Sequence, residues 1–286
     1  MNYQHIRYET HGAVRVITFN RPEVKNCIDR LAHDELCHAF DQFRIDPDAK
    51  VAVLTGAGDS AFCAGGDLKA AFSGNPPIPT SAEEIARHNR GEAPGCLGPS
   101  RWTDIYKPVI AAVNGLAYAG GLEWACFADL RIVEEHASFG VTCRRWNIGL
   151  ADGGTQRLPR IVGMGRALEL ILTGKVIDAA EAYRIGLANE VVAKGQGMTR
   201  ALELAEFIAS LPQAAIRNDK EAAVRGFGEP LREGLRIEAE CFNRVLGSPQ
   251  DKAEMFEGLR RFNERDHPDR IQGQARTPGI VRAEMD

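Results

Sequence analysis

Short apolar runs bounded by turn residues characterise the first half of the chain. The stretch 13–19 (AVRVITF) is rich in β-branched residues and ends at an Asn-Arg-Pro turn, which is typical of a strand. Similar runs predict buried strands at 51–54, 109–113 and 130–133. Helical spacing predicts helices at 31–43, 67–72 and 122–129. Two of the strands are followed by a glycine-containing joint and then a helix, so the pattern predicts a layered α/β core.

From about Gly163 onward the apolar positions follow helical spacing almost without interruption. They predict helices near 163–172, 178–185, 198–210, 212–225, 230–245 and 250–263. Asp178 and Pro212 are suitable residues for the starts of two of these helices. The second half of the chain is therefore expected to be nearly all helical.

The connection 73–100 differs from the segments around it because it is rich in glycine and proline. These residues are Gly74, Pro76, Pro77, Pro79, Gly91, Pro94, Gly95, Gly98 and Pro99. A short helix is predicted at 82–89. A connection of this length inside a compact domain usually serves as a lid or is mobile, so we expect it to cover the functional site.

Composition narrows the class of protein. The net charge of −4 predicts no general attraction to nucleic acid or to an anionic membrane, and the apolar runs are too short to span a bilayer. Seven scattered cysteines without a CxxC pair, together with an N-terminus that lacks a secretory pattern, predict a cytoplasmic protein with reduced thiols. The seven histidines show no metal-ligand spacing, and no nucleotide-binding phosphate loop occurs, so neither a metal nor a nucleotide cofactor is expected.

Two glycine pairs lie at strand-to-helix joints, in 62–68 (FCAGGDL) and 117–123 (AYAGGLE). Either pair alone is explained equally well by a tight turn that needs small residues. Together they suggest that two main-chain N–H groups converge on one oxygen and form an oxyanion hole. The start of a helix adds a favourable partial positive charge there.

Through these glycine pairs and several further motifs, the sequence resembles the crotonase, or enoyl-CoA hydratase/isomerase, family. The motifs that carry the resemblance are NRPEVKN (20–26), FCAGGDL (62–68), KPVIAAVNGLAYAGGLE (107–123), DLR (129–131), ASFG (137–140) and GGTQRLPRIVG (153–163). They occur in order between about residues 3 and 265. The resemblance implies a spiral core of ββα units with an acyl-CoA site over 1–200, and a C-terminal helical trimerisation region over 201–286. It implies a homotrimer or dimer of trimers, and no cofactor beyond the coenzyme A moiety of the substrate.

The resemblance also assigns ligand-binding roles. The oxyanion donors would be the N–H groups of Gly66 and Gly120. Positions that would contact coenzyme A are Lys25, Ala64, Gly65, Gly66, Asp67, Leu68, Phe262 and Arg265. Lys25 would meet the phosphates, and Phe262 and Arg265 match positions that in some relatives reach a neighbouring subunit. For Lys25 and Arg265, solvated surface charge is an equally good interpretation.

Glu123 and Cys143 occupy the positions of the two catalytic glutamates of the family's hydratases. Glu123 would transfer protons at the α-carbon or activate water, and its alternative role is that of a helix-dipole partner or a core ion pair. Cys143 is a departure, because a thiol with an ordinary pKa near 8.5 replaces glutamate poorly at neutral pH. Arg144 and Arg145 would lower that pKa if they faced the pocket, although a small packing residue is the simpler interpretation.

Asp152 is a second candidate for proton transfer. Some isomerases of the family are similar in carrying an aspartate here, and the alternative role is an N-cap for the helix that begins near Gly153. With Glu123 and Asp152 across the acyl chain from each other, either hydration or double-bond isomerisation is expected. The alternative from another class is a non-catalytic acyl-CoA-binding protein, which the missing second glutamate would favour.

Overall fold

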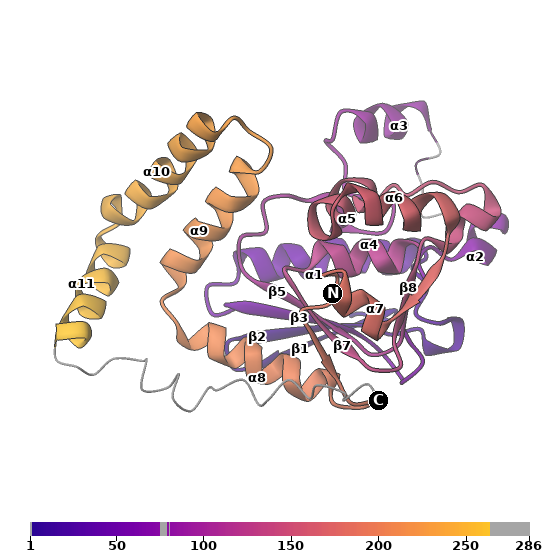
Figure 1. Ribbon diagram of the computed structural model, residues 1–286, viewed down its shortest axis with the longest axis horizontal. Coiled ribbons are helices and arrows are strands. Elements are labelled where there is room, and N and C mark those ends of the chain that lie inside the picture. Colours follow the sequence, from indigo (N-terminus) through magenta and orange to yellow (C-terminus); the bar gives the residue numbers. More distant parts are fainter. Residues whose placement is uncertain (1, 75–78, 80, 264–286) are drawn as a thin grey trace. The chain divides into compact units, whose positions relative to one another are not determined.

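The computed structural model describes residues 2–74, 79 and 81–263. The strands are β1 (Ile6–His11), β2 (Val14–Phe19), β3 (Val51–Gly56), β4 (Ala61–Cys63), β5 (Val109–Val113), β6 (Leu116–Tyr118), β7 (Leu130–Glu134), β8 (Ser138–Gly140), β9 (Val176–Asp178) and β10 (Glu190–Val192). The helices are α1 (Arg30–Ile45), α2 (Leu68–Phe72), α3 (Ala82–Asn89), α4 (Gly120–Phe127), α5 (Gly154–Val162), α6 (Met164–Thr173), α7 (Ala179–Arg184), α8 (Gly197–Ser210), α9 (Gln213–Gly226), α10 (Leu231–Gly247) and α11 (Pro249–Asn263). Figure 1 labels most of these elements.

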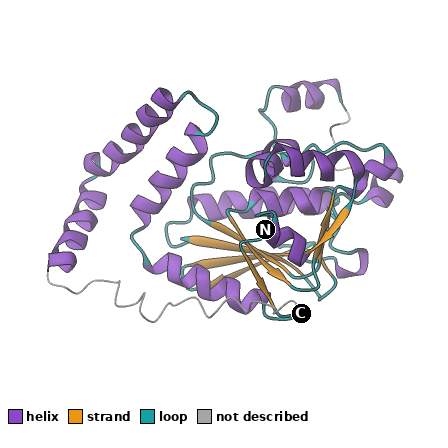
Figure 2. Ribbon diagram, in the orientation of Figure 1, coloured by secondary structure: helices purple, strands orange, loops and turns teal. Residues whose placement is uncertain are grey.

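From β3 to β8, each turn of the chain adds one strand to each of two sheets. The larger sheet has the order β1-β2-β3-β5-β7-β10, and the smaller has the order β4-β6-β8-β9. Strands β3, β5 and β7 run parallel in the first sheet, while β4, β6 and β8 run parallel in the second. Helix α2 follows β4, and helix α4 follows β6. In Figure 2 the strands, in orange, have helices above and below them. The predicted spiral of ββα units is therefore confirmed.

Strands β2, β3 and β5 of the larger sheet are buried on both faces. Alternate side chains of β2, β3 and β5 pack toward α1, where Leu36, Phe40 and Phe43 are fully buried. The side chains between them pack against Ala201 and Ala205 of α8. Because successive residues of a strand point to opposite faces, a strand covered by helices on both sides becomes continuously apolar. This explains why the apolar runs predicted these strands well.

The short strands were mostly missed. In particular, β9 and β10 lie in the part of the chain that was predicted to be nearly all helical, and that expectation is wrong for both. Strand β9 pairs antiparallel with β8, and β10 pairs parallel with β7. Three residues are too few to show an alternating pattern, so these strands form because an existing sheet edge offers hydrogen-bond partners.

The chain divides into two compact units, 1–213 and 214–286. The predicted boundary at 200/201 falls inside α8, which packs on the larger sheet and so belongs to the first unit. The second unit contains α9 from Ala214 onward, α10 and α11, in which Arg225 and Arg244 pair with Glu221. None of the described helices has both the length and the apolar character that crossing a membrane requires.

Candidate active site

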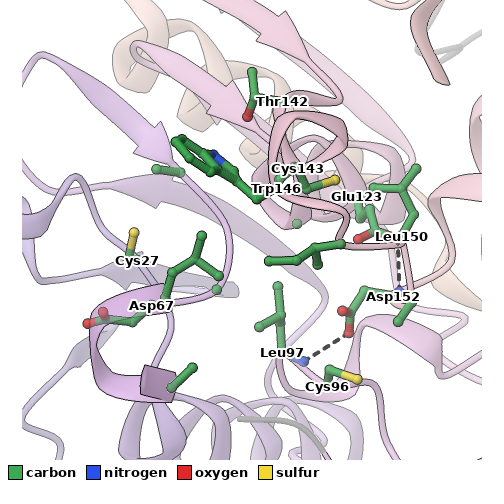
Figure 3. Close-up of a pocket in the computed structure, with 18 of the residues that line it drawn as sticks. Cys27, Asp67, Cys96, Leu97, Glu123, Thr142, Cys143, Trp146, Leu150 and Asp152 are labelled. Carbon is green, nitrogen blue, oxygen red and sulfur yellow. Dashed lines mark hydrogen bonds between the residues drawn. The ribbon is translucent and has the colours of Figure 1, made fainter. Parts of the chain in front are cut away.

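A cavity of about 690 Å³ opens within the first unit (Figure 3). Its walls come from the loop after β2, the two glycine joints, the segment around Leu97, and the stretch from Thr142 to Asp152. In Figure 3, Glu123, Leu150 and Asp152 lie at one end, opposite Cys27 and Asp67. No three His, Cys, Asp or Glu side chains gather as metal ligands in the described part of the chain.

The two glycine joints meet at this cavity. Strands β4 and β6 pair in parallel, so both joints leave the smaller sheet side by side. A Cβ atom added to Gly65 would lie 2.9 Å from the nitrogen of Gly120, which shows how closely the two segments approach. Both Gly66 and Gly120 line the cavity, and neither N–H donates a hydrogen bond to any described residue. Two main-chain donors without a partner among the described residues therefore line the same cavity, and an oxyanion hole is built from such a pair.

The direction of the Gly120 N–H depends on Ala119. This residue has φ 50° and ψ −117°, a conformation that costs energy for any residue with a Cβ atom. Its ψ angle sets the plane of the peptide bond to Gly120. The N–H of Ala119 is fixed by a hydrogen bond to the carbonyl of Gly140 (2.8 Å). The strained residue therefore sets the orientation of the Gly120 N–H at the start of α4.

The other joint is held by the loop at 25–28. Ala64 N–H donates to the carbonyl of Lys25 (3.0 Å), and Ile28 N–H donates to that of Gly65 (2.8 Å). The buried Asn26 side chain donates to the carbonyls of Ala57 and Ala61 and accepts from the N–H of Arg21. The NRPEVKN motif therefore has a structural basis, because it fixes the loop on which the first joint rests.

The predicted coenzyme A contacts separate into three groups. Lys25, Ala64, Gly66, Asp67 and Leu68 line the cavity, whereas Gly65 lies behind it. Asp67 accepts from two N–H groups at the start of α2, and its carboxylate pairs with Arg21 at 2.9 Å, so its role is structural in this state. The Lys25 side chain is exposed, and among the described residues its only hydrogen bond is to Ser60 Oγ (3.1 Å), which leaves its charge available to an anionic ligand.

The remaining two predicted contacts lie elsewhere in the chain. Phe262 is on α11 of the second unit, where it is largely exposed. Arg265 lies outside the described residues. The structure therefore does not test whether either residue contacts coenzyme A.

Glu123 is a buried carboxyl that caps a neighbouring helix. It is 2% exposed, and its Oε1 accepts hydrogen bonds from the N–H groups of Asp152 and Gly154, both 2.8 Å. Gly154 is the first residue of α5, so the predicted helix-dipole role exists, but toward α5 rather than α4. Burial, and then the charge of Asp152, raise the pKa of Glu123 to about 7 against these hydrogen bonds.

Asp152 does not cap the helix that follows it. Gly153 occupies the N-cap position of α5, and the Asp152 carboxyl turns away from that helix. Its Oδ1 accepts from the N–H of Leu97 (2.9 Å) and from the hydroxyl of Ser100 (2.6 Å). The N-cap interpretation is therefore wrong. Burial raises the pKa of Asp152, while both hydrogen bonds act to lower it.

Cys143 lies in the cavity wall but has no activating environment. It is buried in the short 3₁₀ segment Thr142–Trp146. Burial raises the pKa of its thiol, and the nearby Arg144 does not overcome this effect. A thiol held in its protonated form suits packing better than proton transfer at neutral pH.

The connection 73–100 contributes two residues that the sequence did not single out. Its predicted helix at 82–89 is confirmed as α3. Further along, Leu97 lines the cavity and Ser100 binds Asp152. Gly95 and Gly98 were the feature of the sequence that could have pointed to this close packing. A Cβ atom on Gly95 would lie 2.2 Å from Asp152 Oδ1, so no larger residue fits there. Nothing in the sequence shows what these glycines pack against.

Paired main-chain donors beside two buried carboxyls define an enzyme that stabilises an anionic intermediate and moves protons next to it. The family model described as "Enoyl-CoA hydratase/isomerase" matches residues 9–272, and the chain belongs to this family. The comparisons support the enzymatic prediction over the non-catalytic binding protein.

Similar proteins cover almost the whole chain. It is 36% identical to the (E)-benzylidenesuccinyl-CoA hydratase of Thauera aromatica, over 92% of this chain and 97% of that protein. It is 35% identical to the short-chain-enoyl-CoA hydratase of Clostridium acetobutylicum, over 89% of this chain and 94% of that protein. The solved structure of enoyl-CoA hydratase from Mycobacterium tuberculosis H37Rv superposes on this chain with a TM-score of 0.81. The two sequences are 32% identical, and the match covers 91% of this chain and 96% of that chain.

Proposed function

We propose that the protein catalyses reversible addition of water to the double bond of a 2-enoyl-CoA thioester. The observation that carries this proposal is the presence of Glu123 and Asp152 in one cavity with the free N–H groups of Gly66 and Gly120. Relatives named as hydratases support the choice of reaction. The cationic Lys25 at the cavity supports binding of the coenzyme A phosphates.

The thioester oxygen accepts from the two glycine N–H groups and becomes more negative as water attacks the β-carbon. Burial raises the pKa of both carboxyls, and the charge of Asp152 raises that of Glu123 further, to about 7. The mechanism uses the state in which the pair carries one proton. The ionised carboxyl takes a proton from the water molecule, and the oxygen of that water bonds to the β-carbon. The protonated carboxyl gives its proton to the α-carbon. The pair is left with one proton, so the step balances without a metal or other cofactor.

The test is hydration of crotonyl-CoA, followed by loss of its absorbance and by chromatography of the product. Wild-type protein should give 3-hydroxybutyryl-CoA, and Asp152→Asn should lower kcat by about 10²-fold or more. The amide oxygen of asparagine can still accept from Leu97 and Ser100, so the fold should be retained. Full activity of Asp152→Asn would remove Asp152 from the mechanism. Binding of enoyl-CoA esters of several lengths without turnover would overturn the proposal itself.

Double-bond isomerisation is the second candidate. It is favoured by Cys143, which leaves the cavity without the second glutamate of the family's hydratases. Two carboxyls that exchange one proton suffice to move a double bond, because no water is consumed. Incubation with 3-pentenoyl-CoA, with separation of the 2- and 3-isomers, distinguishes the two reactions.

We also propose a homotrimer or dimer of trimers in the cytoplasm. Large apolar side chains are exposed on α10 and α11, which supports assembly through the second unit. All seven cysteines are free, which is consistent with a reducing compartment. Native mass spectrometry showing only monomer at micromolar concentration would contradict the assembly.

A further inference from the structure

The Asp152 carboxyl is bound on one oxygen only. Both donors, the Leu97 N–H and the Ser100 hydroxyl, meet Oδ1, and Oδ2 accepts no hydrogen bond from any described residue. Ser100 is fully buried, and its contact at 2.6 Å is short for a hydroxyl and a carboxyl. The two oxygens of one side chain therefore have different surroundings.

Ser100 is itself fixed by several contacts. It lies in the short 3₁₀ segment Pro99–Arg101, and its carbonyl accepts a hydrogen bond from the Arg157 guanidinium. The same guanidinium donates to the carbonyls of Asp152 (3.3 Å) and Trp102 (3.1 Å), and it stacks on the ring of Phe127 at 5.2 Å. One cation thus joins the backbone that carries Ser100 to the backbone that carries Asp152. The backbone that carries the serine is therefore held in place relative to Asp152.

We propose that Ser100 is a positioning residue that makes Oδ2 of Asp152 the oxygen that gains and loses the proton. A hydroxyl has one hydrogen to donate, and here it is committed to Oδ1 together with the Leu97 N–H. A proton on Oδ1 would displace one of these donors and leave it buried without a partner. The proton is therefore carried by Oδ2, on the side that the two donors leave open. This inference rests on the proposed role of Asp152 in proton transfer.

Other titratable groups act on Asp152 and enter any test by pH. They come from α1, β4, α3, the segment at 96, α4 and α5, and are His33, Cys63, His88, Cys96, Glu123 and Arg157. The two histidines favour the charged form of Asp152, as Ser100 does. Because all of them remain when Ser100 alone is changed, the difference between wild type and variant isolates the hydroxyl.

The experiment compares Ser100→Ala and Ser100→Thr with wild type over a pH series of crotonyl-CoA hydration. Losing a hydrogen bond to a charged carboxylate raises its pKa, so Ser100→Ala should move the acid limb of kcat/KM to higher pH by about one unit. It should lower kcat about tenfold with little change in KM. Ser100→Thr keeps the hydroxyl and should restore the wild-type pH profile. Ser100→Ala combined with Asp152→Asn should be no slower than Asp152→Asn alone, since the hydroxyl then has no proton transfer to support.

Thr55→Ala is the matched control. Thr55 is a buried hydroxyl that donates to the carbonyl of Ala112 (3.0 Å) in the larger sheet, away from the cavity. The Thr55→Ala variant should be less stable than wild type, but the pH profile of its activity should not shift. If circular dichroism shows that Ser100→Ala does not fold, Ser100→Cys is used instead, because a thiol is of similar size to the hydroxyl but is a weak donor. An unchanged pH profile in the folded variant, while Asp152→Asn is inactive, would overturn the role of Ser100 and leave the proposed function intact. An inactive wild type would overturn the proposed function instead.

Discussion

The main-chain N–H of Asp152 donates a hydrogen bond to the Glu123 carboxyl at 2.8 Å. The two proton-transfer candidates are thus joined directly through the backbone of one and the side chain of the other. Gly154 N–H binds the same oxygen of Glu123. The position of the glutamate therefore depends on the start of α5, and the position of the aspartate depends on the segment around Leu97.

Glu123→Gln should abolish most hydration activity while it preserves the fold. The amide oxygen can still accept from Asp152 and Gly154, but the side chain no longer carries a transferable proton. We expect kcat to fall by about 10²- to 10⁴-fold with a KM close to wild type. Steady-state kinetics with crotonyl-CoA measures both values. A loss smaller than tenfold would show that Glu123 is mainly a cap for α5.

Gly154→Ala should disturb the site because no space exists for a methyl group. The added Cβ atom would lie 2.7 Å from Cγ of Glu123 and 2.9 Å from its Oε1. We expect the free energy of unfolding to fall by about 1–3 kcal/mol and hydration to slow. Gly165→Ala is the control, since its Cβ atom would meet nothing within 4 Å inside α6. It should raise stability by up to about 1 kcal/mol, and urea unfolding of both variants provides the comparison.

Stability of the unliganded protein should depend on pH through Glu123. Its pKa in the folded state is about 7, above its usual 4.5. Between these two values the folded state binds more protons than the unfolded state, so the free energy of unfolding falls as pH rises from about 4.5 to 7.

Urea unfolding at pH 5 and pH 7.5 tests this dependence. Wild type should lose stability relative to Glu123→Gln as the pH rises, because glutamine cannot ionise. Parallel changes in the two proteins would assign the pH dependence to other groups.

Cys143→Ala should leave the reaction largely intact. The buried thiol stays protonated at neutral pH because burial raises its pKa, so it has no proton-accepting role to lose. We expect kcat within about threefold of wild type, with a small loss of stability from the missing sulfur. Cys27→Ala removes another thiol of the cavity wall and serves as the control. A hundredfold loss confined to Cys143→Ala would place this thiol in the mechanism.

An acyl group that carries its own carboxylate should be a poor substrate. Two buried carboxyls, Glu123 and Asp152, lie at the end of the cavity where Leu97 and Leu150 form apolar walls. A third negative charge there is disfavoured by repulsion and by burial. We expect kcat/KM for glutaconyl-CoA to be at least about tenfold below that for 2-pentenoyl-CoA. Equal values would mean that a cation not seen in these walls reaches the acyl end.

The sequence predicted the elements whose pattern depends on local burial. Strand β5 and helix α3 have the predicted bounds, because one is apolar on both faces and the other begins with a Ser81 cap. Glu123 and Asp152 were identified from motifs, and both line the cavity. The contacts that define their chemistry were not predictable. Ser100 lies 52 positions before Asp152, and nothing local indicates that the two side chains meet.

Because the dihedral angles of Ala119 are unfavourable, a substitution at this position that raises stability is expected to lower the rate of turnover. A glycine there would adopt φ 50° without steric cost, so selection for heat resistance alone would favour it. The peptide plane ahead of Gly120 would then rotate more freely, and the amide proposed to bind the thioester oxygen would be oriented correctly for a smaller fraction of the time. A thermostabilised variant of this enzyme should therefore be engineered with residue 119 held constant, and improvements sought on helices remote from the joint.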